Sequence, residues 1–260
     1  MTKRIAILSA LALFILLPGA AHAASHAAAA SAAASGGLSI DFSGGGLFTD
    51  RMMQIVALIT ILSVAPSILI MMTSFVRIVV VLSLLRTALG LQQSPPNSVI
   101  VSLALFLTLF VMTPTLKDAY NQGIAPLIAN QITTEQAFDK TTFPMKKFML
   151  GHVRESDLKL FMDMSGNKAP PTAEAVPLTT IAPAFMLSEL KRAFEIGFLI
   201  FVPFLIIDMA VASILMSMGM MMLPPVVVSL PFKLIFFVLV DGWRLVAGSL
   251  VESFHRAAGG

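Results

Sequence analysis

The residues best placed to do chemistry in this sequence are charged side chains set inside long apolar runs. Asp208 and Asp241 stand among aliphatic and aromatic neighbours, and Arg77 does the same in an earlier run. A charge in such surroundings is costly in lipid, so it usually marks a pathway or pairs with a charge on another helix. The sequence therefore predicts that Asp208, Arg77 and Asp241 are buried and serve a function.

A methionine-rich segment begins soon after Asp208, with methionine at positions 216, 218, 220, 221 and 222 around Gly219. The double proline Pro224–Pro225 stops a helix there. Broken backbone inside an apolar bundle is tolerated only where protein or a water-filled cavity surrounds it. Methionine is flexible and polarizable, so a cluster can seal a gap of variable shape, but it is also a common core filler. From the residues alone, a compressible seal in a conduit and ordinary packing both stay open.

Composition narrows the class of protein. The 260 residues are 57 % apolar and 12 % charged, with a mean hydropathy of +0.89, whereas soluble domains carry roughly 25 % charged residues. We therefore expect a membrane protein. The net charge of +3 is too small and too dispersed to suggest nucleic-acid binding.

The sequence offers no pattern typical of an enzyme or a metal protein. Cysteine is absent, which excludes disulfides and thiolate chemistry. His152 has no second histidine at ligand spacing, Ser, His and acidic residues do not cluster, and HExxH is missing. We expect no catalytic residue, no metal and no cofactor.

Residues 1–23 read as a cleaved signal peptide. Lys3 and Arg4 precede the apolar stretch Ile5–Leu17, and Ala21-His22-Ala23 supplies a small-residue cleavage site. An uncleaved anchor helix is the alternative, but the apolar stretch is short for a span. Residues 24–50 are rich in Ala, Ser and Gly and read as a linker.

Residues 51–116 read as a first helical pair. The run 52–85 would be roughly 50 Å long as one helix, well beyond a hydrocarbon core of about 30 Å. We expect Pro66 to kink or divide it, giving one bent helix or a helix plus a span. The second member is 99–116, which contains no charge.

Residues 117–182 form a polar, amphipathic helical region. Thr133-x-x-Gln136 resembles a capping box that starts a helix. Between 146 and 164 an apolar stripe predicts a helix, and Phe148 and Phe161 lie beside the stripe. Core packing and a subunit contact are both open for this stripe.

Residues 183–260 read as a second helical pair, with runs at 184–222 and 234–251 on either side of the methionine-rich segment. Four spans leave that segment inside but without Lys or Arg before Lys233, which conflicts with the positive-inside rule. The conflict, with the charges inside the runs, suggests helices buried in an oligomer more than bathed in lipid.

Several stretches together resemble the FliP/SctR family, the export-gate proteins of type III secretion and flagellar assembly. They are MTSFVRIVVVLSLLRTALGLQQSPPNSV (72–99), FLTLFVMTP (106–114), PAFMLSELKRAFEIGFLIFVPFLIIDMAVASILMSMGMMMLPP (183–225) and LPFKLIFFVLVDGWRLVAGSL (230–250). They cover most of the chain after the signal. The signal and the length are similar to the flagellar branch of the family.

The resemblance implies an all-α membrane-associated fold of long kinked helices and helical hairpins, assembled into an oligomeric helical export gate. It implies a homo-pentamer joined by FliQ-like and FliR-like subunits, with FlhA-like and FlhB-like components nearby. The assembly would belong to the flagellar basal body at the bacterial inner membrane, with much of it on the periplasmic side. Exported flagellar proteins would be its cargo.

The same resemblance assigns roles to residues. It places a gasket that constricts the channel on Met220, Met221 and Met222. It makes Glu189 and Lys233 partners across a subunit interface, a pairing we hold as a hypothesis. Phe148 and Phe161 are candidates for contacts made during pentamer formation.

The implied function is a core subunit of a gated channel that passes unfolded flagellar proteins and performs no bond-breaking chemistry. A small-solute or ion transporter with a relay of Asp208, Asp241 and Arg244 is one alternative. It predicts an inverted repeat, which is not evident between 52–116 and 184–251. A purely structural scaffold is another, and it predicts that any apolar residue is tolerated at 220–222.

Overall fold

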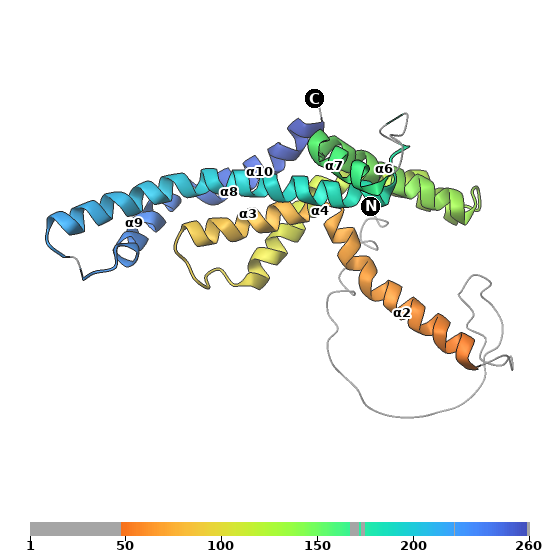
Figure 1. Ribbon diagram of the computed structural model, residues 1–260, viewed down its shortest axis with the longest axis horizontal. Coiled ribbons are helices and arrows are strands. Elements are labelled where there is room, and N and C mark those ends of the chain that lie inside the picture. The colour runs from red at the N-terminus through yellow and green to blue at the C-terminus, as the bar shows by residue number, and fades with distance from the viewer. Residues whose placement is uncertain (1–47, 167–171, 173–174, 221, 259–260) are drawn as a thin grey trace, which may run out of the picture. The chain divides into compact units, whose positions relative to one another are not determined.

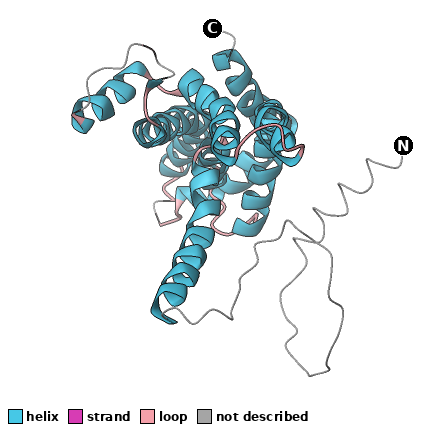
Figure 2. Ribbon diagram, turned by 90° about the vertical axis from the view of Figure 1, so that its right-hand side faces the viewer, coloured by secondary structure: helices cyan, strands magenta, loops and turns pink. Residues whose placement is uncertain are grey.

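The computed structural model describes residues 48–166, 172, 175–220 and 222–258. In this part of the chain the regular elements are helices, without a strand (Figure 2). The chain divides into residues 1–50 and a compact unit, Arg51–Gly260. The expected signal peptide 1–23, and the linker 24–50 up to residue 47, lie outside the described residues.

The first long apolar run is divided, but not at Pro66. Helix α2 (Phe48–Met71) continues through position 66, and α3 (Phe75–Ala88) begins after a break at 72–74. There the Thr73 hydroxyl donates to the Ile70 carbonyl at 2.7 Å and accepts the Phe75 N–H at 3.3 Å. Side-chain hydrogen bonds of this kind compete with the helical backbone pattern, so a threonine marks the division and the proline does not.

Helix α4 (Asn97–Ala119) passes directly into the π-helical turn η1 (Tyr120–Ile124) and α5 (Ala125–Ile128). The expected span 99–116 is therefore part of a continuous helical segment of 32 residues. Gly123 in η1 lies so close to α6 (Thr134–His152) that an added Cβ would stand 2.8 Å from the Thr141 backbone nitrogen. Glycine is what permits this approach.

The polar region forms two helices, α6 (Thr134–His152) and α7 (Glu155–Ser165). The capping box is confirmed, because Thr133 and Gln136 exchange both side-chain to backbone hydrogen bonds. The chain is extended at Val153 and Arg154, so the expected stripe between 146 and 164 does not occupy one face. Met149 before the break is buried and Met164 after it is exposed.

Helix α8 (Leu178–Ser217) is 40 residues long and continues through Pro183 and Pro203. At roughly 60 Å it is about twice the thickness of a hydrocarbon core. It packs against α3, α6, α7 and α9 (Figure 1). Because one helix touches so many others, it holds the rest of this unit in register.

The expected fourth span, 234–251, is broken. Helix α9 (Pro225–Leu239) and helix α10 (Gly242–Ala258) meet at an angle of 62°. The break falls at Asp241, whose φ of 51° is left-handed and cannot continue a right-handed helix. By length and composition, α4–α5 and α8 could each cross a membrane, and α9 with α10 could form one further broken span.

The core lies along α3, where α4, α8 and α10 meet. The largest buried cluster gathers residues from these four helices: Ile78, Val81, Leu82, Ile100, Ala104, Val111, Ala193, Leu250 and Phe254. A second cluster joins α6 to α8 through Met149, Ile181 and Phe185. Arg77, described below, packs against Phe254 of the first cluster.

Candidate gate loop and buried charge network

Helix α8 ends in a well-formed C-terminal cap that starts the segment 218–224, which we call the Met loop. The Met220 N–H donates to the Leu215 carbonyl at 3.0 Å, and the Gly219 N–H to the Met216 carbonyl at 3.1 Å. This is a Schellman motif, with Gly219 in the left-handed conformation at φ 74°. Pro225 then opens α9 at its first position, where proline is favoured. Helix α8 therefore ends at the Gly219 cap, before the double proline that was expected to stop it, and Pro224–Pro225 instead mark the start of α9.

The Met loop methionines that the structure describes do not fill the core of this chain. Met220 is 44 % exposed and Met222 is 98 % exposed, while Met221 lies outside the described residues. Large apolar side chains held at a surface need cover from lipid or from another protein surface. The loop therefore presents methionine outward from the end of the α8–α9 hairpin.

A polar clamp crosses the same hairpin below the loop. Asp208 on α8 accepts a hydrogen bond from the Lys233 ammonium at 2.6 Å and another from the Ser229 hydroxyl, both on α9. Lys233 is almost fully buried, and the Asp208 carboxylate is 30 % exposed. A buried ammonium without a carboxylate partner would be strongly unfavourable, so this pair fixes the alignment of α8 with α9.

A second buried pair joins α3 to α8 at the centre of the unit. Arg77 donates from Nε to Glu189 Oε2 at 2.7 Å and from Nη2 to Glu189 Oε1, so the contact is bidentate. Arg77 Nη1 also donates to the Ser253 hydroxyl of α10 at 3.0 Å. The guanidinium carbon lies 3.7 Å from the centre of the Phe254 ring, a cation–π contact. One arginine therefore ties three helices together.

A third polar cluster docks α7 onto α8. Asp157 accepts two hydrogen bonds from Arg154 at 2.8 and 2.9 Å and one from the Ser188 hydroxyl at 2.6 Å. Burial acts to raise the pKa of Asp157, but the hydrogen bonds from Ser188 and Arg154 and the Arg154 charge outweigh it, and the pKa lies below its ordinary value. The aspartate therefore stays ionised and holds the first turn of α7.

Known proteins match this chain over most of its length. The FliP family matches residues 58–250, and with them α3, α4, α8, α9, the Met loop and both buried charge pairs. The chain belongs to the FliP family.

Two relatives show how far the similarity extends. The Flagellar biosynthetic protein FliP of Caulobacter vibrioides is 58 % identical over 260 residues, covering 99 % of this chain and 94 % of the relative. The protein of the same name from Bacillus subtilis is 55 % identical over 201 residues, covering 77 % of this chain and 91 % of the relative. The FliP resemblance predicted from the motifs is confirmed.

Within this FliP-family chain, Glu189 and Lys233 have partners other than each other. Glu189 pairs with Arg77 and Lys233 with Asp208, all inside a single chain. The expected pairing of Glu189 with Lys233 across a subunit interface would have to displace both contacts. Sequence reasoning missed these intrachain pairs because their members are 112 and 25 residues apart.

The charges expected to be buried separate into three cases. Arg77 is buried, with 1 % of its side chain exposed, and Asp208 is partly buried. Asp241 is exposed and lies at the break between α9 and α10, where the backbone turns away from the helix. Asp241 is therefore not buried within a single chain, and its burial in an assembly stays a prediction. The apolar residues on both sides of Asp241 gave no sign that a helix ends there.

The two candidate contact phenylalanines lie in different surroundings. Phe148 packs inside the chain, with its ring centre 5.9 Å from that of Phe185 and 6.3 Å from that of Phe254. Phe161 on α7 is half-buried. A role of Phe148 between subunits would require these internal contacts to change, whereas Phe161 keeps part of its surface available.

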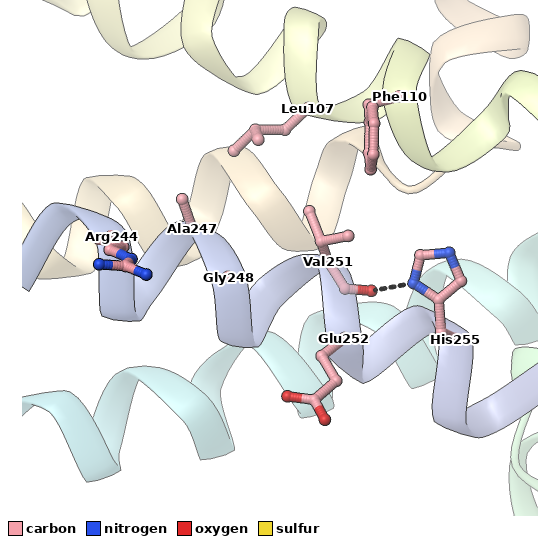
Figure 3. Close-up of a pocket in the computed structure, with 8 residues that line it drawn as sticks. All are labelled: Leu107, Phe110, Arg244, Ala247, Gly248, Val251, Glu252 and His255. Carbon is pink, nitrogen blue, oxygen red and sulfur yellow. Dashed lines mark hydrogen bonds between the residues drawn. The ribbon is translucent and has the colours of Figure 1, made fainter.

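An apolar groove of about 530 Å³ runs between α4 and α10 (Figure 3). Leu107 and Phe110 line one wall, and Ala247, Gly248 and Val251 line the other. The polar side chains of Arg244, Glu252 and His255 stand along the α10 side. In the part of the chain that the structure describes, no group of three or more His, Asp or Glu residues could hold a metal ion.

Proposed function

We propose that this chain is a core subunit of the flagellar type III protein export gate, and that its Met loop seals a channel for unfolded flagellar proteins. The family membership supports a part in flagellar biosynthesis. The observation that carries the gating role is the outward exposure of Met220 and Met222 on a loop that the Schellman cap, the double proline and the Asp208–Lys233 clamp hold in place. Flexible thioethers can deform around varied side chains and close again.

The proposed assembly is a homo-pentamer in the bacterial inner membrane, within the flagellar basal body and largely on its periplasmic side. FliQ-like and FliR-like subunits would join it, and FlhA-like and FlhB-like components would lie nearby. Support comes from the outward apolar face of α8, where Phe194, Phe198, Leu199, Val202, Leu205, Ile206 and Met209 are exposed in a single chain. An apolar surface this large is typical of a protein or membrane contact.

Catalysis forms no part of this proposal. The channel would conduct passively, with energy supplied by other components of the apparatus. Asp208 is engaged by Ser229 and Lys233, and Arg244 lies 4.0 Å from Asp241 in an exposed i,i+3 pair. These charges are not gathered into a relay in one chain, so the structure does not favour the transporter alternative.

The experiment measures the leak of small ions and solutes in cells that carry Met220, Met221 and Met222 all changed to Ala, with assembly of the complex verified. We expect a raised leak with export retained, since alanine cannot span the gap that methionine closes. The matched control changes Met52 and Met53 to Ala, because both are exposed methionines but lie on α2, away from the Met loop.

An unchanged leak in an assembled complex would assign the seal to a partner subunit. Full tolerance of any apolar residue at 220–222, with leak and export both normal, would favour the purely structural scaffold. A leak that rises equally in the Met52 and Met53 control would show a general membrane defect and would contradict the gating role.

A further inference from the structure

The hairpins α3–α4 and α8–α9 share one sequence pattern at their turns, a glycine followed by four residues and two prolines. In the first hairpin the pattern runs from Gly90 to Pro96, with LQQS between the glycine and the prolines. In the second it runs from Gly219 to Pro225, with MMML in the same four places. The next helix begins at the second proline or directly after it. The frame of the Met loop therefore occurs twice in the chain.

The first glycine also ends its helix as the second one does. The Leu91 N–H donates to the Arg86 carbonyl at 3.2 Å, and the Gly90 N–H donates to the Thr87 carbonyl at 3.0 Å. These are the hydrogen bonds of a Schellman motif, and φ is 77° at Gly90 against 74° at the glycine of the Met loop. The segment 89–95, which we call the Gln turn, is therefore the structural counterpart of the Met loop.

Both turns lie at the same end of their hairpins. Arg77, early in α3, contacts Glu189, early in α8. Leu89, at the end of α3, belongs to the same buried cluster as Phe204, which lies further along α8. The two helices therefore run in the same direction. The repeat is direct, unlike the inverted repeat that is typical of many transporters.

The Gln turn stands beside the hairpin that carries the Met loop. A Cβ added at Gly90 would lie 3.9 Å from the Leu230 side chain of α9. Leu230 is next in the chain to Ser229, which donates a hydrogen bond to Asp208 of α8. From Asp208 to the cap at Gly219, α8 rises about 16 Å. An extended polypeptide covers that distance in about five residues, so a single extended chain is long enough to reach both turns.

The side chains at the tip of the Gln turn are not needed to hold its backbone. Arg86 Nη1 does so instead, by donating to the Pro95 carbonyl at 3.3 Å and to Asn97 Oδ1 at 2.5 Å. Gln92 and Gln93 are exposed, and their amides make no hydrogen bond within the part of the chain that the structure describes. Two primary amides are therefore presented on a fixed turn, where the Met loop presents thioethers.

We propose that the Gln turn is a second contact of the export channel, at which Gln92 and Gln93 hydrogen-bond the backbone of the exported chain. This inference rests on the proposed function, because it takes the Met loop to face an unfolded polypeptide. A primary amide offers two donors and an acceptor, and each residue of an extended chain, apart from proline, carries one backbone donor and one acceptor. The contact therefore does not depend on the sequence of the cargo.

The first test places a photo-reactive amino acid at one position at a time in the full-length protein. The cells carry the whole export complex, stalled by a flagellar substrate fused to a domain that cannot unfold. The positions are Gln93, Met222 and, as the control, Lys140, which is exposed but lies on α6, a helix that packs against the early part of α8. We expect adducts with the stalled substrate at 93 and 222 and none at 140.

The outcomes separate this inference from the proposed function. An adduct at 222 without one at 93 overturns the contact at the Gln turn and leaves the role of the Met loop standing. An adduct at 93 with another subunit in place of the substrate also overturns it. With the substrate shown to be stalled, the absence of adducts at both positions overturns the inference and the proposed function together.

The second test separates guiding from sealing. Gln92→Leu with Gln93→Leu leaves backbone groups of the passing chain unpaired, which is unfavourable away from water. We expect secretion of flagellar substrate to slow by roughly fivefold for each hydrogen bond lost, with small-ion leak unchanged. The Met loop triple variant is expected to do the reverse. Gln92→Asn with Gln93→Asn keeps both amides and is the matched control. Equal secretion by the Leu and Asn variants overturns the hydrogen-bonding role.

Discussion

At the scale of single residues, the chain solves the problem of charges in apolar surroundings by pairing them internally. Arg77 and Glu189 are both almost fully buried, and every polar atom of the pair that the structure describes faces a partner. A pair of this kind adds little to stability compared with apolar packing, but removing one partner leaves a buried charge that costs about 3–5 kcal/mol. Its main effect is to specify which helix faces which.

The first prediction concerns this pair. Glu189→Arg places two guanidinium groups together, so we expect loss of the folded protein from the membrane fraction. The double variant Arg77→Glu with Glu189→Arg restores opposite charges in the same place and should recover at least part of the protein. Immunoblots of membranes and a motility assay measure both.

The matching control is Glu189→Arg with Lys233→Glu. This double variant should not recover, because Lys233 belongs to Asp208 within the chain. Recovery in this variant and failure of the Arg77 swap would instead establish the pairing of Glu189 with Lys233 between subunits.

A second prediction concerns the hairpin clamp. Lys233→Met keeps the length and apolar stem of the side chain but removes the ammonium, leaving Asp208 with Ser229 alone. We expect the hairpin to loosen at a cost below the about 3–5 kcal/mol of a fully buried pair, since Asp208 is partly exposed. The leak measurement described for the Met loop should rise. Lys233→Met combined with Asp208→Leu removes both charges and should return the leak toward its normal value. A leak unchanged by Lys233→Met would separate the clamp from the seal.

At the scale of elements, contacts between backbone atoms limit how closely two helices can approach each other. A Cβ at Gly123 would lie 2.8 Å from the Thr141 nitrogen and 2.9 Å from the Ala137 oxygen, both backbone atoms of α6. Backbone cannot rotate aside as a side chain can. The π-helical turn η1 thus places Gly123 directly against α6. Turns of this kind are frequent at functional sites.

The third prediction follows from that contact. Gly123→Ala should separate η1 from α6 and lower the melting temperature of the purified protein. Gly151→Ala is the matched control, since a Cβ there meets nothing within 4 Å, and alanine in a helix is favoured over glycine by roughly 0.5–1 kcal/mol. The control should be neutral or stabilising. Equal melting temperatures for both variants would show that the two elements are not in close contact in the assembled protein.

At the scale of the whole molecule, the compact unit leaves much of its apolar surface uncovered. The exposed side of α8 carries large aliphatic and aromatic side chains along a helix about twice as long as a hydrocarbon core is thick. A helix of this length that stands perpendicular to the membrane plane cannot be surrounded by lipid along its full length. Part of it must be covered by protein or stand outside the bilayer.

The fourth prediction tests what covers α8. The chain contains no cysteine, so Phe198→Cys provides a single attachment site for a fluorophore on this face. In the proposed assembly the label should be shielded from brominated lipid, because a neighbouring subunit covers it. A label on Met53→Cys in α2 is the comparison on another exposed apolar helix. Strong quenching at position 198 in the assembled complex would show that this face contacts lipid.

Much of the fold can be predicted from residues that lie close together in the sequence. The capping box at Thr133 and Gln136, the double proline where α9 begins and the turn after α3 each involve residues close in sequence, so their chemistry acts without the rest of the chain. The all-helical class and the family motifs follow from the same kind of information. The division at Thr73 was missed because Pro66 is the stronger helix breaker in general. The sequence does not predict the break at Asp241, because the apolar residues around it give no sign that the backbone there is left-handed.

The sequence by itself determined that this is an all-helical, membrane-associated member of the FliP family with a methionine-rich loop between two long apolar segments. Only the tertiary structure decided the partners of its charges. Arg77 meets Glu189 and Ser253, and Lys233 meets Asp208, through contacts that span up to 176 residues. An ionic pair depends on distance in space and on burial. Neither can be read from the residues beside the charge, because both depend on how α4, α8 and α10 pack around α3 and how α9 packs against α8.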